Sequence, residues 1–128
     1  MAATWLMVGV IWIVQLVHYP MFAFLDQREF SRSHAFHSSA ISFVVLPAMV
    51  VELVLAGLIL MGKPNAASIT GFALVLLIWA ATFLIMIPIH NKLGAGGYQL
   101  DLIHSLVRWN WVRTVAWSVR GFIALFWL

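Results

Sequence analysis

The chain has 128 residues, of which 64% are hydrophobic and 9% are charged, and its mean hydropathy is +1.03. An ordinary soluble domain carries about 25% charged residues, so this composition excludes one and indicates an integral membrane protein with the lipid bilayer as its surroundings. The absence of cysteine excludes disulfides and thiolate metal sites. The net charge of +3 forms no basic patch and accompanies no nucleic-acid motif, so no nucleic-acid partner is expected.

Four segments are long and apolar enough to cross a bilayer, which takes about 20 residues each. They cover residues 4–25, 40–61, 68–89 and 102–128. A Gly-Lys-Pro-Asn turn at 62–65 and a glycine-rich loop at 93–98 connect the later segments. The polar stretch 26–39 is expected to begin the second helix early, with Ser31 or Ser33 as its N-cap. We predict one all-α domain over residues 1–128, an integral-membrane up-down four-transmembrane-helix bundle.

Positive charge is distributed unevenly between the two sets of connections. Arg28, Arg32 and Lys92 lie in the connections after the first and third segments, whereas the other face has only Lys63. Because cytoplasmic loops are enriched in Lys and Arg, both termini are expected outside and the two larger connections in the cytoplasm. The N-terminus lacks the basic region of a signal peptide, so the first helix is expected to be retained.

The last segment is unusually polar for a helix in lipid, where a charge at the bilayer centre costs at least about 2.5–3.5 kcal/mol. On a helical wheel, one side carries Asp101, His104, Arg108 and Trp111. The opposite side carries Asn110, Arg113, Trp117 and Arg120. A helix that is polar on two faces is expected to contact polar groups of other helices, of a second subunit or of a ligand.

All five histidines are expected near the cytoplasmic end of the bundle, and every segment contributes at least one. They are His18, His34, His37, His90 and His104. Imidazole binds iron, copper and zinc, so this layer predicts a metal site. The expected ligands are one per helix, with His34 as an alternate or supporting residue: His18, His37, His90 and His104. A haem held between His18 and His90 is the other cofactor that the pattern allows. Each histidine other than His18, taken alone, is better explained as an ordinary polar residue at the membrane interface or at a helix end.

Glu52 is the other ionisable residue expected deep in the membrane. We predict a buried ion pair with Arg113, or failing that with Arg120, because an unpaired charge in lipid is costly. A proton-relay carboxylate is the alternative, which makes Glu52 a candidate catalytic residue. Arg108 lies about one helical turn from His104 and is the candidate for orienting a polar or anionic substrate group.

Several motifs resemble those of a family of small four-helix bacterial inner-membrane proteins, and the resemblance covers nearly the whole chain. They are Q-L-V-H-Y-P (15–20), H-x-x-H (34–37), L-P-x-M-x-x-E (46–52), I-P-I-H (87–90) and N-W-x-R-T-x-x-W-x-x-R (110–120). The resemblance implies a location in the bacterial inner membrane and carries no catalytic assignment. Size and layout are also similar to the haem-binding four-helix protoporphyrinogen oxidases, at the level of fold only.

Three functions remain open from the sequence. The first is a membrane-embedded oxidoreductase that acts on a hydrophobic membrane-dissolved substrate. Its cofactor would be His-ligated iron or copper, with zinc as a further option, or haem. The second is a non-catalytic small subunit or assembly factor of a larger membrane complex, which the absence of a soluble domain favours. The third is a metal or proton conduit, formed as a homo-oligomer, which would need ionisable groups at successive depths through the bilayer.

Overall fold

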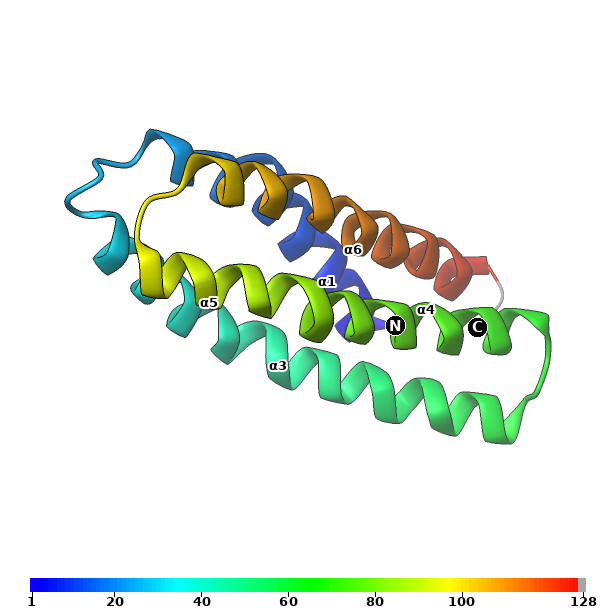
Figure 1. Ribbon diagram of the computed structural model, residues 1–128. Coiled ribbons are helices and arrows are strands. Elements are labelled where there is room, and N and C mark those ends of the chain that lie inside the picture. Colours follow the sequence, from blue (N-terminus) through cyan, green and yellow to red (C-terminus); the bar gives the residue numbers. More distant parts are fainter. Residues whose placement is uncertain (127–128) are drawn as a thin grey trace.

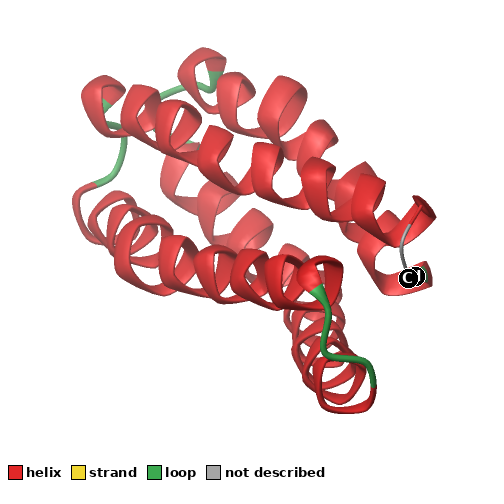
Figure 2. Cartoon of the chain, turned by 90° about the vertical axis from the view of Figure 1, so that its right-hand side faces the viewer, coloured by secondary structure: helices red, strands yellow, loops and turns green. Residues whose placement is uncertain are grey.

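The computed structural model describes residues 1–126 as four helical rods joined by short loops (Figure 2), with no strand in this range. The first rod contains α1 (Ala2–Ile13), the π-helical turn η1 (Val14–His18), α2 (Tyr19–Met21) and the 3₁₀ turn η2 (Phe22–Phe24). The second rod is α3 (Phe30–Gly62). The third rod contains α4 (Ala66–Ala81), the π-helical turn η3 (Thr82–Met86) and α5 (Ile87–Gly96), and the fourth is α6 (Leu100–Phe126). The prediction of an all-α fold with four helices is confirmed.

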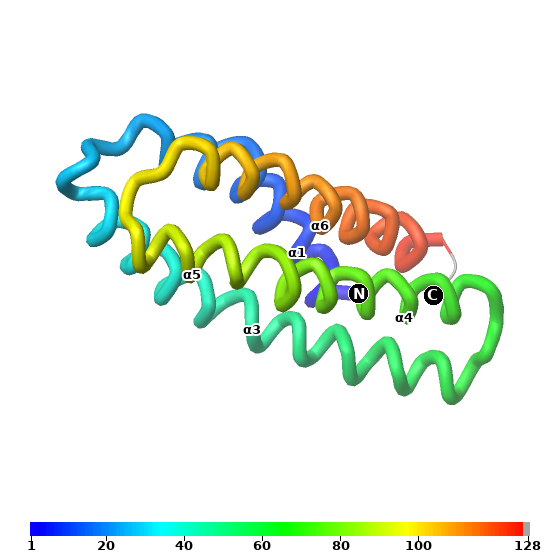
Figure 3. The backbone as a smooth tube through the Cα atoms, in the orientation of Figure 1, coloured from blue at the N-terminus to red at the C-terminus, as the bar shows by residue number. Residues whose placement is uncertain are grey.

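The four rods form a bundle in which each packs along two neighbours. The first rod packs against α3 and α6, and α4 packs against the same two helices from the other side. The connections around 25–29 and 97–99 lie together at one end (Figure 3), and the N-terminus and the last turns of α6 lie toward the end with the 63–65 turn (Figure 1). The histidine-bearing parts of the rods therefore lie at the end opposite the 63–65 turn.

Two expected helix boundaries were wrong. The second helix begins at Phe30, and its N-cap is Glu29 rather than Ser31 or Ser33, without a side-chain cap. The third rod continues through the glycine-rich stretch expected to be a loop from residue 93. It ends only at Gly96, and the next residue, Gly97, has a φ of 74°, a left-handed conformation that glycine adopts without steric cost. Both helices are longer than expected because residues 30–33 and 93–96 can form helical backbone hydrogen bonds despite their polar or glycine-rich composition.

Three rods are long and apolar enough to cross a membrane. They are Ala2–Phe24, Phe30–Gly62 and Ala66–Gly96. Within the described residues α6 does not meet this criterion of hydropathy and charge, because it carries three arginines and an aspartate along its length. Of the expected fourth span, residues 127–128 lie outside the described residues.

Each π-helical turn immediately precedes an X-Pro pair. Proline lacks an N–H, and its ring clashes with the carbonyl four residues earlier, so it disturbs the regular hydrogen bonding of an α-helix. The residue before each proline donates instead to the carbonyl five residues back, Tyr19 to Val14 and Ile87 to Thr82. One extra residue in a turn changes the register of everything beyond it. Beyond the two turns, Tyr19 and His90 face one another.

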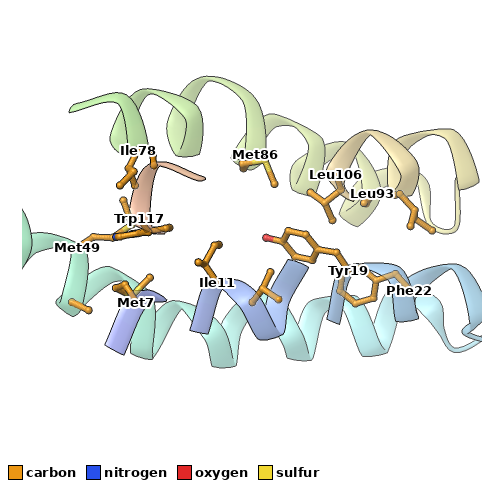
Figure 4. Close-up of a cluster of buried hydrophobic side chains, with 14 of the residues drawn as sticks. Met7, Ile11, Tyr19, Phe22, Met49, Ile78, Met86, Leu93, Leu106 and Trp117 are labelled. Atoms are coloured by element: carbon orange, nitrogen blue, oxygen red, sulfur yellow. The ribbon is translucent and has the colours of Figure 1, made fainter. Parts of the chain in front are cut away.

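The apolar core runs along the bundle axis (Figure 4). Trp117 packs with Met7, Met49 and Ile78 in the half nearer the termini, and Phe22 lies near the other end. Burying a side chain of this size away from water contributes roughly 1.5–3 kcal/mol. The close packing of these side chains holds the buried polar groups, such as Gln15, Glu52 and Arg113, in fixed positions.

Candidate functional site

Four of the five histidines converge at one end of the bundle, from three different rods. The Nε2 atom of His34 lies 2.9 Å from Nδ1 of His90, within hydrogen-bonding distance. The rings of His37 and His90 are stacked with their centroids 6.3 Å apart, and those of His18 and His37 are 5.4 Å apart. His34 is buried and the other three are half-buried. The sequence prediction of a histidine layer at this end is thus correct for these four residues.

Two aromatic side chains fill the space around the histidines. Phe22 contacts the rings of His34 and His37 at centroid distances of 5.6 and 5.1 Å. The hydroxyl of Tyr19 lies 3.1 Å from Nε2 of His90, so both ring nitrogens of His90 have a polar neighbour. His34, His90 and Tyr19 form a continuous polar chain that leads from the end of the bundle into its interior.

His37 is the member of the cluster whose polar atoms are incompletely satisfied. Its Nε2 is buried and has no hydrogen-bond partner. A buried unpartnered nitrogen of this kind costs about 1–3 kcal/mol unless something binds it. No three His, Asp or Glu side chains within residues 1–126 already have the arrangement of a metal site.

His104 lies apart from the other histidines. It is exposed and lines an outer groove between the first rod and α6, together with Arg108 and Trp111. The structure therefore does not bring one histidine from each helix together as expected: α6 brings none to the cluster, and His34 lies within it. The reason is rotational: α6 turns its Asn110–Arg113 side inward, and the opposite side that carries His104 faces out.

Below the histidines lies an internal cavity of about 240 Å³. Most of its wall is apolar, formed by side chains such as Ile11, Val14 and Met86. Its polar wall residues come from all four rods: Tyr19, Ser38, Ser42, Thr82, His90, Asn91 and Arg113. Figure 4 shows the hydroxyl of Tyr19 pointing along the bundle interior toward Ile11. The polar chain from His34 thus ends at this cavity.

A buried polar network joins η1 to α6 beside the cavity. The Oε1 atom of Gln15 accepts hydrogen bonds from Asn110 Nδ2 and Thr114 Oγ1, both at 3.0 Å. Gln15 Nε2 donates to the carbonyl of Val107 at 3.0 Å. Arg113 reaches the edge of this network, where its Nη1 lies 3.4 Å from Asn110 Oδ1. The inward polar face of α6 meets polar groups of the first rod, as the sequence predicted.

The ion pair of Glu52 forms with Arg120, the second choice from the sequence, and not with Arg113. Arg120 Nε lies 3.1 Å from Glu52 Oε1, and Trp117 Nε1 donates to Glu52 Oε2 at 2.8 Å. Arg120 also donates to the carbonyl of Gly71 at 3.0 Å. Arg113 lies two helical turns, about 10 Å, farther along α6, which is beyond the reach of this carboxylate.

Sequence reasoning assigned no role to Tyr19 or Gln15, which both belong to the site. Tyr19 stands between His18 and Pro20, and only the π-helical turn directs it toward His90. Gln15 had a detectable signal, since an uncharged amide in a lipid-spanning segment needs polar partners. The spacing of residues in α6 did not predict which of them, Asn110 and Thr114, would bind Gln15.

No protein-family model matches the sequence, and neither a characterised protein nor a solved structure matches the chain.

Proposed function

We propose that the chain is a bacterial inner-membrane oxidoreductase whose histidine cluster binds an iron or copper ion and acts on a hydrophobic, membrane-dissolved substrate. The observation that carries this proposal is the convergence of four histidine rings from three rods, one of which, His37, has a buried nitrogen without a partner. Imidazole is the preferred ligand of such ions, and both iron and copper change oxidation state by one electron. Zinc would fit the same ligands but would not supply redox chemistry.

The spacing of the imidazole nitrogens supports a metal ion. Two nitrogens that each lie about 2.0–2.1 Å from one ion are roughly 2.9–3.4 Å apart. His34 Nε2 and His90 Nδ1 are 2.9 Å apart, which suits a shared ion as well as a hydrogen bond. The ion would be held by His34, His37 and His90, with His18 beside them. Tyr19, hydrogen-bonded to His90, would orient that ring.

Haem fits these residues poorly. A porphyrin needs a flat slot between its two axial ligands, whereas His34 and His90 are in direct contact and Phe22 packs against His34 and His37. The cavity of about 240 Å³ next to His90 is below the range of about 300–1,000 Å³ typical of pockets for drug-sized ligands, and haem is larger still. We therefore propose a metal ion in place of the haem alternative.

The membrane topology is part of the proposal. All four rods, α6 included, would cross the bilayer in alternating directions, because the buried arginines of α6 contact the other rods rather than lipid. The larger number of basic residues near the loops at 25–29 and 97–99 supports a cytoplasmic location for the histidine end and places both termini outside.

Metal analysis of the purified protein tests the function. We expect about one iron or copper per chain, with an absorption or paramagnetic signature, and loss of that metal in His34→Ala and His90→Ala. His104→Ala is the matched control, because His104 lies outside the cluster, and it should retain the metal. Metal-free protein that remains folded and functional in cells would contradict the proposal.

A non-catalytic subunit of a larger complex is the second candidate. It is favoured by the outer groove where His104, Arg108 and Trp111 lie exposed on α6. Polar side chains on a lipid-facing surface are costly, so a partner helix could cover them. Copurification of a stoichiometric partner that is lost on Arg108→Ala, together with metal-free protein, would favour this reading.

A further inference from the structure

Arg113 is a buried cation without a carboxylate partner. Three charged side chains are buried within residues 1–126, namely Glu52, Arg113 and Arg120. Glu52 and Arg120 form the sole salt bridge in this part of the chain. Arg113 is only 5% exposed, and its side-chain hydrogen-bond partners are the neutral groups of Tyr19 and, at 3.4 Å, Asn110. The bundle interior therefore carries one uncompensated positive charge.

The surroundings of Arg113 leave hydrogen-bonding capacity unused. Its Nε is buried without a partner. The indole of Trp117 lies 5.3 Å from the guanidinium carbon, a cation–π contact that offsets only part of the cost of burying the charge. Ser38, which lines the same cavity, also has a buried hydroxyl without a partner. Two separate polar groups on the cavity wall thus lack the acceptors or donors that native interiors normally supply.

The cavity connects this cation to the outer surface of the bundle. Arg113, Tyr19 and His90 form part of its wall deep in the bundle. Its other wall residues include Leu46 on α3 and Asn91 on α5, which are both exposed. A molecule could therefore enter between α3 and α5 from the side that the proposed topology turns toward lipid.

We propose that this cavity binds the anionic head of a single-chain amphipathic molecule, a carboxylate or a phosphate, through Arg113. The planar guanidinium matches both groups, because its N–H donors pair with two oxygens at once. A volume of about 240 Å³ is below the range of about 300–1,000 Å³ typical of ligand pockets, so it holds a head group while an apolar tail extends between α3 and α5. Binding itself follows from the cavity alone, but the role of this molecule as substrate rests on the proposed function, since the head would lie beside His90.

Binding of radiolabelled ligands to the full chain in detergent micelles tests the site. The probes are decanoate, decyl phosphate and the neutral decanol, compared at equal micelle concentration. We expect decanoate or decyl phosphate to bind at least tenfold more tightly than decanol, and the better of the two identifies the head group. Arg113→Gln should abolish this preference for the anion. Arg28→Gln, which removes an exposed arginine outside the cavity, should leave it unchanged.

Stability separates loss of the site from loss of the fold. Without ligand, Arg113→Gln should melt at the same temperature as the unmodified chain or higher, because it removes an unpaired buried charge. If it does not fold, Val45→Trp provides a second test, since Val45 lines the cavity and a larger side chain fills it without changing any charge. It should also abolish anion binding.

The outcomes distinguish this inference from the proposed metal site. Arg113→Gln that retains its metal but loses anion binding supports the anion site. Anion binding by metal-free protein supports the site while contradicting the oxidoreductase. Equal binding of decanoate, decyl phosphate and decanol, or unchanged anion binding in Arg113→Gln, would overturn the inference.

Discussion

The Glu52–Arg120 pair offers a quantitative test of how this bundle holds charge in its interior. Both side chains are buried, at 3% and 4% exposure. Glu52→Gln keeps the shape of the side chain and removes its charge, which leaves the buried guanidinium of Arg120 without a counter-charge. Removing one partner of a buried pair costs about 3–5 kcal/mol of unfolding free energy, because the remaining charge stays desolvated.

The double variant completes the cycle. Glu52→Gln with Arg120→Gln removes both charges, so most of the loss should be recovered, with a coupling energy of a few kcal/mol. Arg113→Gln is the matched control on α6 and should cost much less than Arg120→Gln. Unfolding by sodium dodecyl sulfate, followed by far-ultraviolet circular dichroism, measures each free energy. If Glu52→Gln lies within about 1 kcal/mol of the unmodified chain, or if the two single losses simply add, the pair is not coupled. Loss of activity at full stability would instead make Glu52 a catalytic proton carrier.

Three further outcomes are expected. Gln15→Leu leaves two α6 donors without their acceptor and should cost about 1–3 kcal/mol of unfolding free energy, measured in the same denaturation assay. Tyr19→Phe removes the hydroxyl beside His90 and should weaken metal binding about 10- to 100-fold in a competition titration while the fold persists; unchanged affinity would show that Tyr19 does not orient the ligand. Single cysteines at Asn65 and Gly96 should react with an impermeant maleimide on intact cells at position 65 only, and the reverse pattern would invert the proposed topology.

The fold was largely predictable because composition and hydropathy dominate it. Segments of apolar residues separated by glycine, proline and polar turns define helices regardless of their partners. The start of α4 depends only on neighbouring residues in the sequence. Asn65, which follows Gly-Lys-Pro, caps this helix through a reciprocal pair of hydrogen bonds with Ser68. The helix boundaries were less predictable. The first turns of α3, which begins at Phe30, consist largely of polar residues that can lie in a helix or in a loop.

The candidate site was predictable only in part, for a geometric reason. The spacing of Asn110, Arg113 and Arg120 placed these three residues on one side of α6. Which side faced the bundle could not be decided, because both sides carry polar residues, and so His104 was assigned to the wrong surroundings. The π-helical turn before Pro20 also changes the register beyond it, so that the position of Tyr19 could not be obtained from a regular helical wheel.

The central claim, a metal ion at the histidine cluster, is tested most directly by X-ray absorption at the edge of whichever metal copurifies with the chain. We predict three or more imidazole nitrogens in the first coordination sphere, at about 2.0–2.1 Å. His37→Ala should remove one of them, whereas His104→Ala should leave the spectrum unchanged. A spectrum without imidazole scattering, or the same spectrum in both variants, would contradict the claim.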